Sequence, residues 1–287
     1  MRFKKVYIEI GNSCNLSCHF CIKNQRVIKQ MSIEEFTLVL VQLQPYTKYL
    51  YFHVLGEPLL HPHLEEFLKI ANQLGFYVNI TTNGTLLEKQ LDMLINAEAL
   101  RQVNISVHSF SEQNGPNQEH YLSNIIHSAK ELAKVNKYVS LRLWNMRNGN
   151  LDNESLSIAQ AFQTAFNCKH EIKVKESMKL ADHIFLQFDE VFAWPTLEHE
   201  HVSKVGTCHG LKQMLGILAN GDVVPCCLDS TGAAKMGNIF EECLDNIIQS
   251  NYFKQRENER RQGILNEPLC QRCVYRTRFN KEEIHEY

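Results

Sequence analysis

The 287-residue sequence lacks three features that would point to a membrane, to export or to a nucleic acid. No run approaches the roughly 18 consecutive apolar residues that a membrane-spanning helix needs. The first ten residues alternate like a strand and have neither the apolar core nor the cleavage site of a signal peptide. The formal net charge is only -2, so binding to nucleic acid or to a membrane surface is not expected. These absences predict a cytoplasmic protein.

The composition is otherwise ordinary, with 44% hydrophobic and 22% charged residues and no low-complexity tract or repeat of solenoid period. The unusual feature is the presence of ten cysteines. In a small secreted protein they would predict disulfides, but tight clusters of reduced thiols in a cytoplasmic chain more often bind metal. Three of them fall within residues 14–21 and six after residue 207, which predicts two separate metal sites.

Short strand-like runs alternate with segments of helical period as far as about residue 190. The expected strands are Val6–Gly11, Tyr49–Leu55, Tyr77–Thr82, Gln102–His108 and Val139–Asn145, with a sixth near Ile172–Lys175 or Ile184–Phe188. The expected helices are one that Ser32 caps, then His63–Leu74, Leu86–Ala97, Glu119–Lys134 and Asn153–Phe166. Repeated units of this kind predict an α/β fold with a right-handed parallel sheet, open or curled into a barrel. In such folds function gathers at the carboxyl ends of the strands.

The pattern changes after about residue 200. Gln213–Leu218, Asn220-Gly221 and Asp222–Pro225 predict a β-hairpin with a type I′ turn. Phe240–Arg261 predicts one long helix, and a Cys-x-x-Cys follows near the end. We therefore divide the chain into residues 1–200 and a small second domain, residues 201–287.

Cys14, Cys18 and Cys21 follow directly on the first expected strand, with the spacing Cys-x3-Cys-x2-Cys. Three thiolates this close together can hold three corners of a [4Fe–4S] cube and leave the fourth iron open. A structural zinc site would need a fourth ligand, and His19 is badly placed between two of the cysteines. Chance crowding of buried thiols is the remaining interpretation.

With Phe20 before the last of these cysteines, the spacing Cys-x3-Cys-x-aromatic-Cys resembles the signature of the radical S-adenosylmethionine (SAM) superfamily. Gly56-Glu57-Pro58, at the end of the second expected strand, resembles the Gly-Gly-Glu-Pro motif of that family, although Leu55 replaces the first glycine. The resemblance implies a partial (β/α)6 TIM-like barrel in which Gly56 and Glu57 contact the amino group of SAM. It also implies that polar side chains on later strands contact the SAM ribose and carboxylate, namely Thr82, Asn83, Ser106 and Arg142. Considered singly, each of these could equally cap a strand or face solvent.

The resemblance implies an activity as well. SAM would bind the open iron, and the reduced cluster would cleave it into methionine and a 5′-deoxyadenosyl radical that takes hydrogen from a substrate. The electron would come from a donor such as flavodoxin or ferredoxin. No side chain is assigned to catalysis itself, because the cofactor supplies the difficult chemistry.

The later cysteines resemble part of the SPASM domain of peptide-modifying radical SAM enzymes. No cysteine follows Cys273, so the resemblance is closer to the shorter twitch domain, which implies one auxiliary [4Fe–4S] cluster on Cys208, Cys226, Cys270 and Cys273. Cys227 is an alternative to Cys226, because adjacent residues of an extended backbone point in opposite directions. Zinc on the same four thiolates is the alternative to iron.

Several functions remain open at this point. The first is a radical SAM enzyme that acts on a peptide or protein side chain, and the second is a twitch-type radical SAM dehydrogenase of a small molecule. A non-catalytic iron–sulfur electron-transfer protein and a zinc-stabilised binding module are the alternatives from other classes, but neither explains the open three-cysteine site beside Gly56-Glu57. Four histidines near strand ends are candidates to line a substrate cavity, namely His53, His61, His63 and His108.

Overall fold

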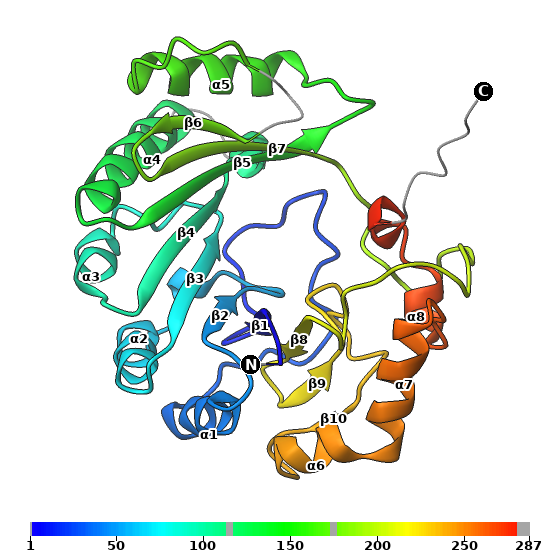
Figure 1. Cartoon of the computed structure of the whole chain (residues 1–287). Helices are drawn as coiled ribbons and strands as arrows, with labels where there is room; N and C mark the ends of the chain where they lie inside the picture. The colour runs from blue at the N-terminus through cyan, green and yellow to red at the C-terminus, as the bar shows by residue number, and fades with distance from the viewer. Residues whose placement is uncertain (1, 113–116, 173–176, 280–287) are drawn as a thin grey trace.

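A computed structural model describes residues 2–112, 117–172 and 177–279, and a ten-stranded mixed sheet runs through its centre (Figure 1). The strands are β1 Lys5–Ile8, β2 Tyr49–Phe52, β3 Tyr77–Thr82, β4 Leu100–Ser106, β5 Tyr138–Met146, β6 Met178–Ala181, β7 Ile184–Glu190, β8 Met214–Ile217, β9 Asp222–Val224 and β10 Gly237–Asn238. Their order in the sheet is β10-β9-β8-β1-β2-β3-β4-β5-β7-β6. Strands β1 to β5 and β7 are parallel, which gives the α/β partial barrel that was expected.

The helices cover the outer side of this curved sheet, and the loop that follows β1 lies on its inner side (Figure 1). They are α1 Ile33–Leu43, α2 Leu64–Gln73, α3 Leu91–Asn96, α4 Asn117–Lys134 and α5 Asn153–Ala165, followed in the C-terminal part by α6 Leu244–Gln249, α7 Asn251–Arg261 and α8 Pro268–Gln271. None of the helices in the described residues is long and apolar enough to cross a membrane.

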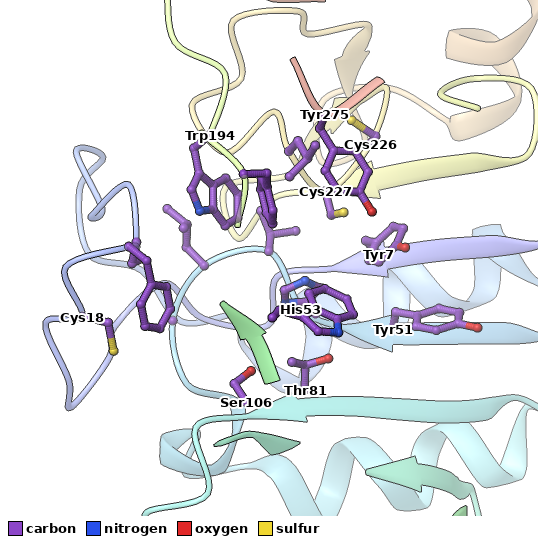
Figure 2. Close-up of a pocket in the computed structure, with 18 of the residues that line it drawn as sticks. Tyr7, Cys18, Tyr51, His53, Thr81, Ser106, Trp194, Cys226, Cys227 and Tyr275 are labelled. Carbon is purple, nitrogen blue, oxygen red and sulfur yellow. The ribbon is translucent and has the colours of Figure 1, made fainter. Parts of the chain in front are cut away.

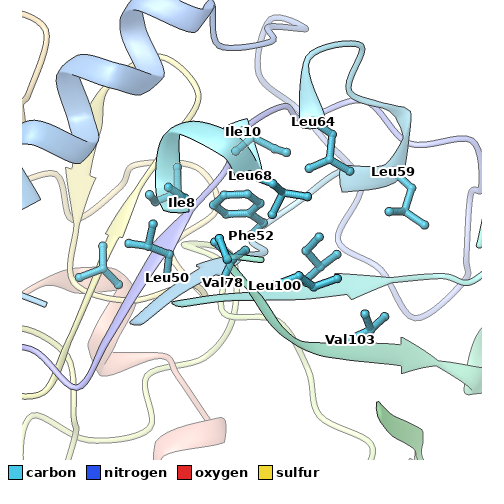
Figure 3. Packing of buried hydrophobic residues seen from close by; sticks show 14 of the residues in the cluster. Ile8, Ile10, Leu50, Phe52, Leu59, Leu64, Leu68, Val78, Leu100 and Val103 are labelled. Carbon is cyan, nitrogen blue, oxygen red and sulfur yellow. The ribbon is translucent and has the colours of Figure 1, made fainter. Parts of the chain in front are cut away.

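Helix α1 shows how the sequence builds this layer. Ser32 accepts a hydrogen bond from the Glu35 backbone N–H, and the Glu35 carboxylate accepts one from the Ser32 N–H, so the expected cap is present as a capping box. The side chains at positions 36, 39, 40 and 43 are buried, as the helical period requires. Phe36 stacks on Phe67 of α2, with ring centroids 4.0 Å apart. Figure 3 shows the neighbouring core, where side chains from β1, β2 and β3 pack beneath α2.

Two expected elements differ from the structure. The single helix expected over Phe240–Arg261 is wrong, because Ser250 adopts an extended ψ of 148°, ends α6 and caps α7 by accepting a hydrogen bond from the Phe253 N–H. Helix α3 begins at Leu91 instead of Leu86, since turns occupy residues 84–90. The sixth parallel strand is β7, as one of the two alternatives predicted; residues 173–175 of the other alternative lie outside the described part of the chain.

The expected hairpin is present as β8 and β9, with Gly216 opposite Val224. Its turn is not type I′, because Gly221 has a φ of +86° whereas Asn220 does not adopt a positive φ. A side chain at Gly221 would overlap the Phe240 ring, so both the turn and the packing require glycine here. The hairpin also does what the sequence did not indicate: β8 pairs in parallel with β1, so it continues the sheet of the barrel.

Candidate active site

A single cavity of about 840 Å³ is lined by cysteines from both ends of the sequence. Cys14, Cys18 and Cys21 line it from the loop after β1. Cys208, Cys226, Cys227 and Cys273 line it from the C-terminal part. Figure 2 shows Cys18 on one side of this space and Cys226 and Cys227 on another, with His53 between them. The structure thus brings together two groups of cysteines that lie almost 190 residues apart in the sequence.

The first cysteine loop has a defined backbone. The Cys21 N–H donates to the Cys18 carbonyl at 3.2 Å, and the Leu16 N–H donates to the Cys14 sulfur at 3.5 Å. Cys18 is 8% exposed, whereas Cys14 is exposed and Cys21 partly buried. The Asn83 amide lies 3.8 Å from the Cys14 sulfur and donates to the Asn15 side chain at 2.9 Å. The carboxyl end of β3 therefore supports the cysteine loop directly.

Gly56 fixes the approach of β2 to the same loop. Its φ is +80°, and a Cβ there would overlap the Gly11 carbonyl oxygen and lie 2.9 Å from the Ser13 carbonyl oxygen. The next residue, Glu57, donates its N–H to the Ser13 carbonyl at 2.9 Å. Only glycine combines this positive φ with so close an approach. The residues of the expected Gly-Glu-Pro motif thus pack against the start of the cysteine loop.

The Glu57 carboxylate joins the ends of two strands. It is 4% exposed, and it accepts hydrogen bonds from the Asn83 N–H at 2.7 Å and from the Leu59 N–H at 3.0 Å. Burial raises the pKa of Glu57 to about 6, and these hydrogen bonds act in the opposite direction. Thr82 supports the same corner by accepting the Gly84 N–H at 3.0 Å. The carboxylate therefore has a fixed position, with lone pairs left for a ligand ammonium.

Arg142 contributes a cation to the cavity, and no carboxylate among the described residues forms an ion pair with it. It lies at the centre of β5, opposite Ser106 of β4, with its guanidinium over the Trp144 ring at 4.5 Å. Its Nε is buried and has no hydrogen-bond partner in the described residues. Desolvation lowers the pKa of Arg142 to about 10, so it stays charged at neutral pH. Glu57 is the one carboxyl among the lining residues, so an anionic ligand group is the partner this cation lacks.

Two of the four expected histidines line the cavity, and two do not. His53 and His108 are lining residues, and desolvation lowers the pKa of each to about 4, so both are neutral at physiological pH. The Phe20 ring lies 4.7 Å from that of His108. His61 instead packs on Phe67, with ring centroids 4.6 Å apart, and His63 precedes α2 outside the cavity.

The C-terminal cysteines form a set of thiols that accept N–H hydrogen bonds. Cys208 accepts from the Gly210 N–H at 3.4 Å, and Cys226 accepts from the Leu228 N–H. Cys273 accepts from the backbone of residues 275 and 276, and Cys270 from the Arg260 side chain at 3.3 Å. Donors of this kind favour thiolate ligands over thiols. These four residues therefore suit a cluster held by four thiolates.

The two adjacent cysteines differ in their surroundings. Burial raises the pKa of Cys226, and the nearby thiols of Cys227, Cys208 and Cys270 raise it further. Cys227 instead forms a hydrogen bond with the Tyr7 hydroxyl, and Figure 2 shows the two sulfur atoms pointing in different directions. Within the described residues no three Cys, His, Asp or Glu side chains are placed to hold a single metal ion.

Sequence reasoning missed most of the aromatic lining. Tyr7 and Tyr51 face the cavity from the middle of β1 and β2, and their rings lie 5.3 Å apart. Trp194 and Tyr275 also line the cavity. They lie outside the strands, where no periodic pattern predicts which side chains face inward. Thr81 also lines it and points into the space in Figure 2, beside the expected Thr82. The alternation of side chains along β1, β2 and β3 was the one signal that could have identified Tyr7, Tyr51 and Thr81.

Comparison with known proteins decides the family. The family model of the radical SAM superfamily matches residues 8–155, which is more than half of the chain. This chain belongs to the radical SAM superfamily. A second family model, that of the SPASM iron–sulfur cluster-binding domain, matches residues 208–274 and so contains all four expected C-terminal ligands.

Radical SAM proteins of known structure share the fold. The crystal structure of BtrN in complex with AdoMet and 2-DOIA is 18% identical, covers 95% of this chain and 93% of that chain, and has a TM-score of 0.57. The structure of anSMEcpe with bound AdoMet and Cp18Cys peptide is 15% identical, covers 97% and 91%, and has a TM-score of 0.60. Among curated relatives, the tungsten-containing aldehyde ferredoxin oxidoreductase cofactor-modifying protein of Pyrococcus furiosus is 29% identical over 145 residues. That match covers 47% of this chain and 39% of the relative, so the chain aligns with about two fifths of that protein.

Proposed function

We propose that the protein is a catalytic radical SAM enzyme with two [4Fe–4S] clusters. Cys14, Cys18 and Cys21 hold the cluster that binds SAM, and the auxiliary cluster is held by Cys208, Cys226, Cys270 and Cys273. The observation that carries the proposal is that the three-cysteine loop and three of the four proposed auxiliary ligands, Cys208, Cys226 and Cys273, line one cavity of about 840 Å³. When bound, the first cluster and SAM supply a 5′-deoxyadenosyl radical that removes hydrogen from a substrate.

The residues of the cavity orient SAM in this proposal. Glu57 receives the SAM ammonium on a carboxylate that two backbone N–H groups already hold in place. Arg142 pairs with the SAM carboxylate, which gives its unpartnered Nε an anion, and Ser106 lies opposite on β4. Phe20 offers a flat apolar face beside His108. Gly56, Thr82 and Asn83 position the strand ends that carry these contacts.

The assignment of Cys226 over Cys227 follows from their contacts. Cys226 lies among the thiols of Cys208 and Cys270, whereas the Cys227 thiol bonds to Tyr7. We retain the division at residue 200, since residues 208–274 match the SPASM family as a unit. Cysteines that hold iron–sulfur clusters must remain reduced, so we also propose that the protein acts in the cytoplasm, with a flavodoxin or ferredoxin as electron donor.

For the substrate we propose a peptide or protein side chain. One support is the match to the SPASM family. The other is the structure of anSMEcpe, which contains a bound peptide and 91% of whose chain aligns with this one. A small-molecule substrate is the second candidate. The BtrN structure contains 2-DOIA, and 93% of its chain aligns with this one. Both candidates use the same cavity, so the position of SAM does not depend on the choice.

The proposal is tested by anaerobic reconstitution with iron and sulfide, followed by incubation with SAM and dithionite. We expect about eight iron atoms per chain, as two cubes require, and formation of 5′-deoxyadenosine. A variant with Cys14, Cys18 and Cys21 replaced by alanine should keep about four iron atoms and form no 5′-deoxyadenosine. Zinc in place of iron, or no SAM cleavage by protein that carries both clusters, would refute the proposal.

A further inference from the structure

A buried arginine lies beside one of the four C-terminal cysteines. Arg260, near the end of α7, is 1% exposed, and its Nη2 is 3.3 Å from the Cys270 sulfur. The same nitrogen lies 2.8 Å from Glu267 Oε2, and Glu267 is 4% exposed. Glu267 directly precedes α8, the short helix that carries Cys270. Helix α7 therefore directs a cation from the protein interior onto the sulfur of a proposed ligand.

The other arginines of α7 are placed differently. Arg256 lies one turn earlier, pairs with Glu259 at 2.8 Å and covers the Tyr252 ring. Arg261 pairs with Glu257 at 2.9 Å, and its side chain is 59% exposed. Among the described residues, neither makes a hydrogen bond to a cysteine. The contact of Arg260 with Cys270 is thus a property of one position and not of a generally basic helix.

An ion pair that serves stability alone is the simpler explanation for a buried arginine. Two observations count against it. The Arg260 Nε and Nη1 are buried and have no hydrogen-bond partner in the described residues, and the two Glu267 carboxylate oxygens have none either. The ion pair with Glu267 balances the charge of Arg260 but leaves two of its donor groups unsatisfied, and a buried ion pair of this kind is costly unless further acceptors lie nearby. The second observation is the hydrogen bond from Arg260 to Cys270, since the sulfur atoms of a thiolate-ligated cluster are such acceptors.

We propose that Arg260 raises the reduction potential of the auxiliary cluster through its hydrogen bond to Cys270. The inference rests on the proposed auxiliary cluster. Reduction adds one electron to the cluster, from [4Fe–4S]²⁺ to [4Fe–4S]⁺, and so adds one negative charge. A fixed cation and an N–H donor at a ligand sulfur stabilise the more negative state. The higher potential suits a cluster with no open iron, whose role is to accept an electron from the substrate radical.

The test measures the auxiliary cluster by itself. In full-length protein, alanine replaces Cys14, Cys18 and Cys21, so that reconstitution fills the auxiliary site only. Arg260→Gln is then introduced together with Glu267→Gln, since loss of the arginine alone would leave a buried carboxylate unpaired. Glu267→Gln alone is the reference, so that the loss of the carboxylate is common to the two proteins that are compared. The matched control is Arg256→Gln with Glu259→Gln, which also removes one arginine–glutamate ion pair, in this case one that lies wholly within α7. Each protein is titrated with dithionite, and the reduced cluster is followed by electron paramagnetic resonance.

We expect reduction of the auxiliary cluster to be about tenfold less favourable in the double variant than in Glu267→Gln alone, which for one electron is about 59 mV. The control at positions 256 and 259 should keep the parent potential. Equal potentials in the double variant and in Glu267→Gln, each with about four iron atoms per chain as one cube requires, would overturn the role of Arg260. If the double variant binds no iron, Arg260→Lys is tested in its place. Lysine keeps the positive charge but lacks the planar guanidinium, so the reduction potential should fall by less than in the double variant. No fall in the potential of Arg260→Lys would contradict the inference. A parent protein that binds zinc or no iron would instead overturn the proposed cluster itself.

Discussion

Replacement of Gly56 by alanine tests whether the close approach of β2 to the first cysteine loop is required. The matched control is Gly75→Ala, because Gly75 has nearly the same φ, +78° against +80°, but no atom lies within 4 Å of a Cβ built there. The control therefore measures the cost of a left-handed backbone alone, about 1–2 kcal/mol. At Gly56 the added methyl group would overlap the Gly11 carbonyl oxygen and crowd Ser13. That crowding should add about 1–3 kcal/mol, as overpacking does elsewhere.

The free energy of unfolding of each apoprotein is measured anaerobically by urea titration. We expect a loss of about 1–2 kcal/mol for Gly75→Ala and of about 2–5 kcal/mol for Gly56→Ala. Because the crowding falls on residues 11–13, the Gly56 variant should also reconstitute with fewer iron atoms at the first site, whereas the Gly75 variant should not. Equal losses of stability and equal iron contents for the two variants would show that the cysteine loop tolerates a displaced β2 end.

Three further results are expected. Cys226→Ala should lose the auxiliary cluster, whereas Cys227→Ala should keep it, as iron content and the spectrum of the reduced cluster will show; the opposite result would exchange the two assignments. Arg142→Gln should weaken SAM binding about tenfold or more, since a charge-assisted hydrogen bond contributes about 1.5–3 kcal/mol; unchanged affinity by calorimetry would mean that SAM does not use this cation. Because the pKa of His53 is lowered to about 4 in the folded protein, the unfolded chain binds the extra proton first. The contribution of His53 to stability should fall by about 3 kcal/mol as the pH drops from about 6.5 to 4, and His53→Gln should remove this part of the pH dependence in urea titrations.

The residues that could be predicted from the sequence are those whose signals are local. The triplet at Cys14, Cys18 and Cys21 lies in one loop, so its spacing alone indicates which residues meet. The Ser32 N-cap and the parallel strands also follow from short-range patterns, and the structure confirms both. The spacing of the residues alone does not predict that Gly56 lies beside the cysteine loop. That prediction also uses the rule that the carboxyl ends of neighbouring parallel strands, here β1 and β2, meet at one edge of the sheet.

The features that were missed depend on partners far apart in the sequence. The pairing of β8 with β1 joins residues about 210 positions apart, and no periodicity in either strand records it. The break at Ser250 was missed because the apolar period continues across it, while a single extended residue is enough to start a second helix. The burial of Arg260 was not predicted either, because its partners Glu267 and Cys270 lie beyond the helix that carries it.

The continuous sheet also explains how the two cysteine sets keep a fixed relation. Glu9 follows β1, is 1% exposed, and accepts hydrogen bonds from Arg26 Nη2 at 2.6 Å and from the Ala219 N–H at 3.0 Å. Arg26 belongs to the segment that follows the first cysteine loop, and its Nε donates to the Ser230 carbonyl at 2.7 Å. Together these bonds tie the first cysteine loop to the turns on either side of β9. If the auxiliary cluster exchanges an electron with the substrate, as proposed above, such a fixed separation is required, because a displacement of either site would alter both the position of the substrate and the rate of electron transfer.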